Sequence, residues 1–377
     1  MDSVSIIGKK CTGCSSCVFS CQKHAITFKE DVLGFSFPSV DFKKCINCGN
    51  CLAKCPVNNT SNFLRPLNIF AADAIVRNTD SSSGGIATML ISSFISSGGI
   101  AYCTQFSIEK QKFIFERFSK GFLPKRISGS RYVQSDVSDS LRLCKSDLEA
   151  GLNVLFLGTP CQVDGLIHFL NKQYKNLIAI DILCHGVPSQ KMFFSHLNNN
   201  KIEKPYDNVL FRNRTKYSIR VSDYRGKDLY ESQEKRDLFL EGFQEGRILR
   251  DSCFVCKYSK IERISDISLG DFWGKSVNNS VGNSLILVNT NKGLSFLRQF
   301  QEQMKSVRLL NDIKYITKNN PALRKPVKKS FCRRLFIKSF GKNCDFDKSI
   351  IMSRSLKKRI VELIRRAKIK KNRKASV

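Results

Sequence analysis

From residue 68 onward, short apolar runs alternate with amphipathic segments, and polar or glycine-rich stretches separate them. Apolar runs of this length are typical of buried strands, and apolar residues at helical spacing indicate helices packed on a sheet. We predict strands at 69–76, 100–104, 113–118, 153–157, 177–183 and 264–269, and helices at 86–96 and 161–170. Strands that alternate with helices predict an α/β domain.

The clearest unit lies between residues 153 and 183, where a helix joins two apolar strands. This order predicts a βαβ unit with parallel strands. Thr159 suits the N-cap of the helix and Pro160 its first position, so Cys161 lies in the first turn, where backbone amides favour a thiolate. Cys184 directly follows the second strand. Both cysteines should therefore lie at the carboxyl edge of the sheet, where α/β sheets hold ligands.

The first 63 residues have a pattern that is set by cysteines. Two runs share the spacing C-x2-C-x2-C-x3-C, which is that of a bacterial two-cluster ferredoxin. The runs consist of Cys11, Cys14, Cys17 and Cys21, and of Cys45, Cys48, Cys51 and Cys55. The fourth cysteine of each run reaches across, so Cys55 completes the first 4Fe-4S cluster and Cys21 the second. Zinc is the alternative, because isolated CxxC pairs often bind it, but two matched runs favour clusters.

Four cysteines beyond this domain are candidates for a third site. Cys253 and Cys256 form another CxxC pair, and together with Cys161 and Cys184 they could hold a third cluster. Buried structural cysteines and a surface turn are the alternatives, since ligands this far apart follow no spacing rule. The remaining cysteines have no such setting and are expected to be free thiols: Cys103, Cys144, Cys332 and Cys344.

Two glycine-containing loops are candidates for binding phosphate. Ser83-Gly84-Gly85 precedes the helix at 86–96, and the amides of a helix N-terminus form a phosphate cradle. In the loop that begins at Gly129, Arg131 can pair with a pyrophosphate and Tyr132 can stack on a ring. Short Ser-Gly loops are more often plain turns, and the chain contains no GxGxxG or GxxxxGK motif.

Composition and charge narrow the class of protein. A chain of 377 residues suggests two or three domains, and 42% hydrophobic with 25% charged residues is typical of a globular protein. The sequence has no apolar run long enough to span a membrane and no apolar signal segment before Cys11, so we expect a cytoplasmic protein with reduced or metal-bound thiols. The net charge of +31 is concentrated at residues 321–377, with 20 Lys and Arg and three acidic residues.

The last part of the chain is strongly basic and has an amphipathic pattern. On a helical wheel, Leu356, Ile360, Leu363, Ile364 and Ala367 share one face, with Lys358, Arg359, Glu362, Arg365 and Arg366 opposite. This pattern suits a helix on an anionic membrane, which would hold the protein at the inner face of that membrane. A solvated tail and a docking segment for an acidic redox partner are alternatives. Nucleic acid is disfavoured because aromatic residues and a binding motif are missing from the tail.

Five motifs together resemble one family. They are SGG at 83–85, GSRYVQS at 129–135, GTPCQV at 158–163, DILCHGVPS at 181–189 and DISLGDFW at 266–273. Across residues 68–320 they resemble the beta-subunit family of coenzyme F420 hydrogenases and dehydrogenases. The resemblance implies a flavin-dependent electron-transfer subunit with FAD and a further 4Fe-4S cluster, which favours the third cluster over its alternatives. The flavin contacts that it implies are Ser83, Gly84, Gly85, Ser130, Arg131, Tyr132 and Thr159.

We therefore expect an α+β ferredoxin-like dicluster domain at 1–63, an α/β flavin-binding domain in two parts at 64–150 and 151–325, and a basic helical tail at 326–377. A flavin accepts a hydride as two electrons and releases them singly to clusters. The predicted function is an oxidoreductase whose partner is a small-molecule hydride carrier or a redox protein. His185 is a candidate to donate a proton or hydrogen bond, with a satisfied core histidine as the alternative. The competing hypothesis is a non-enzymatic iron-sulfur carrier subunit.

Overall fold

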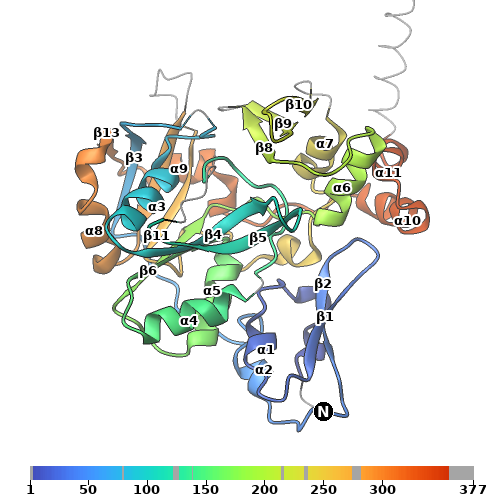
Figure 1. The fold of residues 1–377 in the computed structure, drawn as a ribbon, viewed down its shortest axis with the longest axis horizontal. Coiled ribbons are helices and arrows are strands. Elements are labelled where there is room, and N and C mark those ends of the chain that lie inside the picture. The colour runs from blue at the N-terminus through green and yellow to red at the C-terminus, as the bar shows by residue number, and fades with distance from the viewer. Residues whose placement is uncertain are drawn as a thin grey trace, which may run out of the picture.

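The computed structural model describes residues 3–78, 80–121, 127–137, 139–213, 216–232, 237–273 and 282–355. Figure 1 shows a small N-terminal unit in blue that lies against a larger α/β body, on the side of α4 and α5. The described strands form three sheets, of two, three and eight strands. Among the described helices, none is long and apolar enough to cross a membrane.

The N-terminal unit has an internal repeat that follows the two cysteine runs. Its elements are η1 (Val4–Lys10), α1 (Ser16–Phe19), β1 (Ile26–Glu30), β2 (Ser36–Val40) and α2 (Asn50–Ala53), with β1 and β2 antiparallel. Gly13 and Asn47 have positive φ, and so do Ser15 and Gly49, at matching distances from the first cysteine of each run. These left-handed residues curl the backbone, which then enters a short helix. The two runs therefore fold alike, as the shared spacing predicts.

The eight-stranded sheet forms the centre of the larger body. Its order is β13-β3-β12-β11-β7-β6-β4-β5, in which β4, β6, β7 and β11 are parallel and the other pairs are antiparallel. The strands are β3 (Asn68–Ala74), β4 (Ile100–Ser107), β5 (Lys112–Phe118), β6 (Val154–Gly158), β7 (Leu177–Ile182), β11 (Ile267–Phe272), β12 (Asn283–Val288) and β13 (Met304–Leu309). The six predicted strands are confirmed, and β6, α5 (Pro160–Leu170) and β7 form the predicted βαβ unit.

Helices bury both faces of this sheet. Side chains alternate along β6, so Leu155 packs with α3 (Ile86–Ser96) and α8 (Asn291–Arg298) on one face. Val154 and Phe156 pack with α4 (Ser140–Glu149) and α5 on the other. A sheet covered on both faces has only its edges and strand ends free for ligands. The carboxyl ends of β6 and β7 remain available to a site.

A third layer is built from distant parts of the chain. It contains the sheet β10-β9-β8, four of the described α-helices and a core of phenylalanines. Its elements are β8 (Asn208–Asn213), β9 (Lys216–Ser222), β10 (Asp228–Glu231), α6 (Gln190–Asn199), α7 (Leu238–Gln244), α10 (Arg333–Asn343) and α11 (Phe346–Met352). Phe336, Phe340 and Phe346 are fully buried in this core. Residues 333–352 of the basic segment are thus folded, and the amphipathic pattern that begins at Leu356 lies outside the described residues.

The remaining elements connect these layers. They are η2 (Asp251–Val255), η3 (Gln301–Gln303), α9 (Ile313–Asn319) and η4 (Pro321–Leu323). The segment after Cys55 crosses to the larger body, where Leu64 forms a backbone bridge with Arg263. This segment therefore makes direct contacts with the domain that follows.

A buried histidine joins three helices of the third layer. His196 on α6 is 2% exposed; its Nδ1 lies 2.5 Å from Asp347 of α11, and its Nε2 lies 3.4 Å from Asp237 at the start of α7. Burial opposes the charged imidazolium, but the two carboxylates outweigh it and raise the pKa of His196 to about 9. The charged form therefore contributes to the stability of this layer.

We predict that His196→Gln flattens the pH dependence of stability. The folded pKa of about 9 lies above the unfolded value of 6.5, so the stabilisation is present below pH 6.5 and is lost as pH rises through 9. A shift of this size corresponds to about 3 kcal/mol. Denaturation of wild type and variant at pH 6 and pH 9.5 measures it, with the exposed His24→Gln as control. An equal difference at both pH values would contradict the assignment.

Candidate functional site

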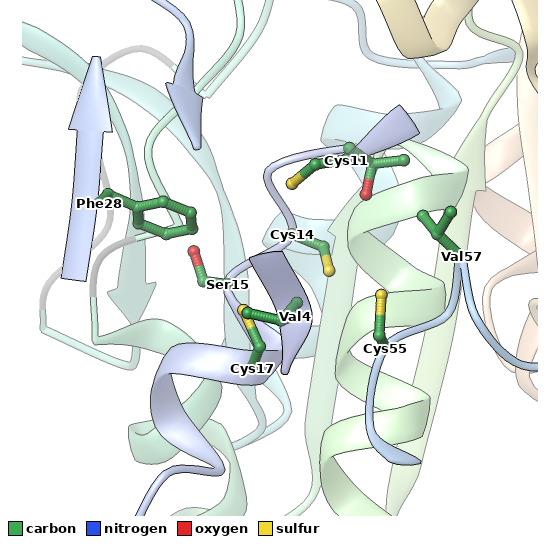
Figure 2. A pocket seen from close by; sticks show the side chains of 9 residues that line it. Val4, Cys11, Cys14, Ser15, Cys17, Phe28, Cys55 and Val57 are labelled. Atoms are coloured by element: carbon green, nitrogen blue, oxygen red, sulfur yellow. The ribbon is translucent and has the colours of Figure 1, made fainter. Parts of the chain in front are cut away.

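The first cysteine group surrounds one small cavity in the N-terminal unit. Figure 2 shows the side chains of Cys11, Cys14, Cys17 and Cys55 around this space, among apolar neighbours such as Val4 and Phe28. These are the four cysteines assigned to the first cluster. Burial raises the pKa of Cys14 to about 12 and that of Cys17 further still, and the neighbouring cysteines add to both shifts. Thiolates at this position need a cationic group such as iron to hold them.

Backbone amides face two of the candidate sulfur ligands in this unit. The N–H of Gly13 donates to Cys11 Sγ at 3.4 Å, and that of Ala25 donates to Cys21 Sγ at 3.3 Å. Hydrogen bonds of this kind help to set the potential of a protein-bound cluster. Within the described ranges, no three His, Cys, Asp or Glu side chains converge on a point where they could share one metal ion.

The second cysteine group lies nearer the surface. Cys48 is exposed, whereas Cys21, Cys45 and Cys51 are half-buried. Asn50 donates a hydrogen bond to the Ser20 carbonyl at 2.7 Å, which holds α2 against the end of α1 beside Cys21. Cys51 contributes to the raised pKa of Cys17, so the two groups are neighbours.

The structure brings the four cysteines of the predicted third site near one another. Cys161 begins α5, Cys184 follows β7, and Cys253 lies in η2, which Cys256 follows. Burial raises the pKa of Cys161, and Cys184, Cys256 and Cys253 all raise it further. The N–H of Gly186 donates to Cys184 Sγ at 3.3 Å. Four thiols from three segments therefore lie in the same region, at the carboxyl edge of the sheet.

The environment of Cys161 differs from the sequence prediction in one respect. Thr159 is the N-cap and Pro160 the first residue of α5, as predicted, and the Thr159 hydroxyl lies 3.2 Å from Cys161 Sγ. The helix start should lower the thiol pKa, yet the pKa is raised, because desolvation outweighs the lowering effect of the Thr159 hydroxyl. Cys161 is thus a half-buried ligand candidate rather than a free nucleophile.

A cavity of about 600 Å³ opens beside this cysteine group. Its volume lies in the usual range for cofactor sites. Most of the predicted flavin contacts line it, as do two of the four cysteines: Ser83, Gly85, Ser130, Arg131, Tyr132, Thr159, Cys161 and Cys184. Gly84 lies behind the wall, where an added Cβ would be 2.5 Å from both Ala72 O and Ser284 N. A glycine at position 84 allows the loop to pack this closely on the sheet.

The N-terminus of α3 faces the cavity. Gly85 is its N-cap at a φ of 79°, and Ile86, Ala87 and Thr88 of the first turn also line the cavity. Ser81 lines the same wall, and its buried Oγ has no hydrogen-bond partner among the described residues. Helix amides together with such a hydroxyl suit an anionic group such as a pyrophosphate.

Two predicted flavin contacts are engaged with protein groups. Arg131 Nη1 donates to the carbonyls of Gly129 at 2.8 Å and Ser128 at 3.1 Å, and burial lowers the pKa of Arg131 to about 10. Its guanidinium is thus turned onto its own loop. The Tyr132 ring stacks on Phe243, with the centroids 4.8 Å apart.

His185 and Trp273 both line the cavity. His185 Nε2 lies 3.3 Å from the Phe243 carbonyl, and its ring meets the Phe243 ring edge-on. Burial lowers the pKa of this imidazole, so it is neutral near pH 7. Trp273 is 44% exposed and lies in the cavity wall rather than in a core.

One part of the cavity wall carries no signal in the sequence. Residues 320–322 and 325–328, just before α10, line the cavity and place Lys325 and Lys328 at its rim. This segment has no motif, and its lysines are indistinguishable in sequence from those of the basic region that follows. Phe243 and Tyr217 were not predicted either, although both aromatics contact Tyr132.

The helix that carries Cys161 also contacts the first cysteine group. A Cβ added at Gly165 would lie 2.5 Å from Cys14 Cβ and 2.9 Å from its Sγ. Gly165 follows Cys161 by about one helical turn. The first and third cysteine groups are therefore separated by little more than α5.

A buried polar group beside Gly165 fixes this contact. Asp164 Oδ2 accepts hydrogen bonds from Ser61 at 2.5 Å and from Tyr258 at 2.6 Å, and Lys257 Nζ lies 3.2 Å away. Burial raises the pKa of Asp164, but hydrogen bonds from His168, Ser61 and Tyr258 and the charge of Lys257 outweigh it, and the pKa is lowered. Asp164 thus joins the segment after Cys55 to the loop after Cys256.

Two segments of the chain match known protein families. Residues 10–59 match the 4Fe-4S dicluster domain, and residues 151–308 match the C-terminal region of the coenzyme F420 hydrogenase/dehydrogenase beta subunit. The chain thus joins a dicluster domain to a region similar to the C-terminal part of that beta subunit, called the beta-subunit region below. It is an iron-sulfur electron-transfer protein related to that beta subunit.

A solved structure shares a distant similarity with the chain. It is a chain of the F420-reducing NiFe hydrogenase complex from Methanosarcina barkeri, with 16% identity and a TM-score of 0.44. The alignment covers 77% of this chain and 90% of that chain. No curated protein matches the chain.

We predict that Gly165→Ala loosens the dicluster domain from the beta-subunit region. Alanine in place of a helical glycine normally stabilises by about 0.5–1 kcal/mol. Here the new Cβ overlaps Cys14, and overpacking costs typically about 1–3 kcal/mol. The variant should lose iron and unfold at a lower temperature, as anaerobic iron analysis and thermal unfolding will measure.

Gly341→Ala is the matched control for this change. Gly341 lies in α10, and an added Cβ would be 3.8 Å from Val32, which is an ordinary contact. This control should keep its iron and gain slightly in stability. The predicted contact would be refuted by a Gly165→Ala protein as stable and as rich in iron as Gly341→Ala.

Proposed function

We propose that this chain is an iron-sulfur flavoprotein oxidoreductase. It transfers electrons between 4Fe-4S clusters and FAD, and the FAD exchanges hydride with a coenzyme F420-like or other small-molecule partner. The observation that carries the proposal is the cavity at the carboxyl edge of the sheet. It is lined by the two glycine-containing loops, by the N-terminus of α3 and by Cys161 and Cys184.

Twelve cysteines would hold the clusters. The first two groups correspond to the ferredoxin pattern. The first group includes the buried Cys14, and the second includes the exposed Cys48. Cys161, Cys184, Cys253 and Cys256 would hold a third 4Fe-4S cluster, because Cys161 and Cys184 line one cavity and the segment with Cys253 and Cys256 lies near enough to raise the pKa of both thiols. Burial raises the pKa of Cys161, Cys184 and Cys253, so these thiols need a metal partner such as iron to become thiolates.

The flavin contacts proposed from the resemblance are Ser83, Gly84, Gly85, Ser130, Arg131, Tyr132 and Thr159. The start of α3 and the Ser81 hydroxyl would bind the pyrophosphate of FAD. Ser82 and Ser130 hydroxyls lie 2.7 Å apart and hold the two loops together at this wall. Bound FAD would supply the conversion between a two-electron hydride and single electrons.

His185 contributes hydrogen bonding rather than charge to this site. Its lowered pKa keeps the imidazole neutral near pH 7, so one ring nitrogen carries a proton and donates a hydrogen bond, while the other nitrogen accepts a hydrogen bond. We propose that it orients the hydride-exchanging ligand by a hydrogen bond. The neighbouring Cys184 places this imidazole directly beside the third cysteine group.

We predict that Cys161→Ser separates hydride uptake from electron transfer to the dicluster domain. With one ligand lost from the proposed third cluster, the FAD should still be reduced by its hydride donor. The visible absorbance of the remaining clusters should bleach at least about tenfold more slowly than in wild type, because electrons now cross a longer gap. Anaerobic stopped-flow absorbance with reduced F420, NADH and NADPH as donors follows both events.

Cys344→Ser is the control, because Cys344 is exposed and lies after α10, outside all three cysteine groups. It should behave as wild type. A wild-type protein that binds no flavin, and whose clusters no hydride donor reduces, would contradict the proposal. That result would favour a non-enzymatic iron-sulfur carrier subunit instead.

A further inference from the structure

Among the residues that the structure describes, four arginine side chains are fully buried, and three of them meet carboxylates. Arg247 pairs with Glu241 and Glu245, Arg263 pairs with Asp181, and Arg333 pairs with Asp251. A buried guanidinium without a counter-charge is strongly unfavourable, so pairs of this kind are the rule. The fourth arginine, Arg250, departs from it.

Arg250 is 1% exposed and is bound by neutral groups. Its Nε donates to the Cys11 carbonyl at 2.7 Å, its Nη2 to the Ser36 carbonyl at 2.8 Å, and its Nη1 to Gln134 Oε1 at 2.9 Å. The ring of Phe37 lies 4.4 Å from the guanidinium carbon. Across the described part of the chain, no carboxylate forms an ion pair with Arg250. Its charge needs another partner.

The position of Arg250 indicates that partner. Its side chain reaches the loop of Cys11, where a Cβ added at Gly13 would lie 3.2 Å from Nη1. Its backbone N–H donates to Val187, and Cys253 follows it by one turn of η2. Burial raises the pKa of Cys253 to about 11, and the guanidinium of Arg250 opposes this rise. The cation thus lies between the first and third cysteine groups.

We propose that Arg250 is the shared counter-charge of the first ferredoxin cluster and the third cluster. This inference rests on the proposed function, because it requires both clusters. A 4Fe-4S cluster with four thiolates is an anion, and reduction adds one further negative charge. A nearby cation that cannot be screened by water favours the reduced state and raises the potential of each cluster.

The electron-transfer step that Arg250 serves is simple. One electron would leave the third cluster, which would be oxidised, and would enter the first ferredoxin cluster, which would be reduced. No covalent bond would change and no proton would move in this step. Because Arg250 lies between the two cysteine groups, its charge would stabilise the electron on either side, and its three hydrogen bonds fix the Cys11 loop relative to η2.

The test is a redox titration of Arg250→Met, followed by electron paramagnetic resonance on anaerobic protein. Methionine removes the charge and keeps much of the apolar stem. With an effective dielectric constant of about 20 and a separation on the order of 10 Å, the loss of one charge changes the equilibrium about tenfold. At a fixed solution potential, the ratio of reduced to oxidised cluster should fall about tenfold, a shift of about 59 mV for one electron.

Two of the three clusters should shift in Arg250→Met, while the cluster at Cys48 should keep its potential. Arg250→Lys retains the charge and should stay near wild type. Arg247→Met removes a buried arginine that is paired with Glu241 and Glu245, so it should lower stability and leave all potentials unchanged. Unchanged potentials in Arg250→Met, or an equal shift of all three clusters, would overturn the proposal.

A second variant covers the case in which Arg250→Met fails to fold. Gln134→Glu places a carboxylate against Nη1 and neutralises the cation, at the cost of the hydrogen bond from Gln134 to the Thr12 carbonyl. It should shift the same two potentials in the same direction.

Iron analysis of the wild type distinguishes a failure of the proposed function from a failure of the proposed role of Arg250. About eight irons per chain would remove the third cluster and with it the proposed function, whereas about twelve irons with no shift would overturn the role of Arg250 alone.

Discussion

The close contact between the Cys14 loop and Gly165 is the constraint on which the rest of the structure depends. A side chain of any size at Gly165 would separate the dicluster domain from α5. Because α5 starts at the carboxyl edge of the sheet with Pro160 and Cys161, this contact also sets the distance from the first cysteine group to the third. The electron transfer that we propose between the domains requires a short distance, and one helical turn separates Cys161 from the contact at Gly165.

The larger body arranges its ligand groups by a simple topological rule. Parallel strands end at the same edge, so residues that follow β6 and β7 meet although 25 positions separate Thr159 from Cys184. The segment from Arg250 to Cys256 enters this edge from a different part of the chain and supplies the buried cation together with two thiols. The cavity opens at this edge, and Gln134 in its wall donates a hydrogen bond to the Thr12 carbonyl of the dicluster domain.

Features that depend on local pattern were predictable from the sequence. Six strands of the large sheet, the βαβ unit, the N-cap at Thr159 and the cysteine groups follow from periodicity, capping preference or spacing, whereas the other described strands were not predicted. The contact at Gly165 and the hydrogen bonds of Arg250 were not predictable, because they join residues more than 100 positions apart through side-chain geometry. The sign of the Cys161 pKa shift was missed for a related reason: the helix start is local, whereas burial is a property of the folded domain.

The basic composition of the C-terminal region conceals its two folded helices, α10 and α11, in the sequence. Phe336 and Phe340 are four positions apart and share one helix face, a signal that the many surrounding lysines and arginines obscured.

The proposed function requires that this chain carries three clusters beside one flavin. Iron, acid-labile sulfide and released flavin per chain can be measured on anaerobically purified protein. We expect about twelve irons, about twelve sulfides and one flavin, whereas about eight irons without flavin would contradict the proposed function.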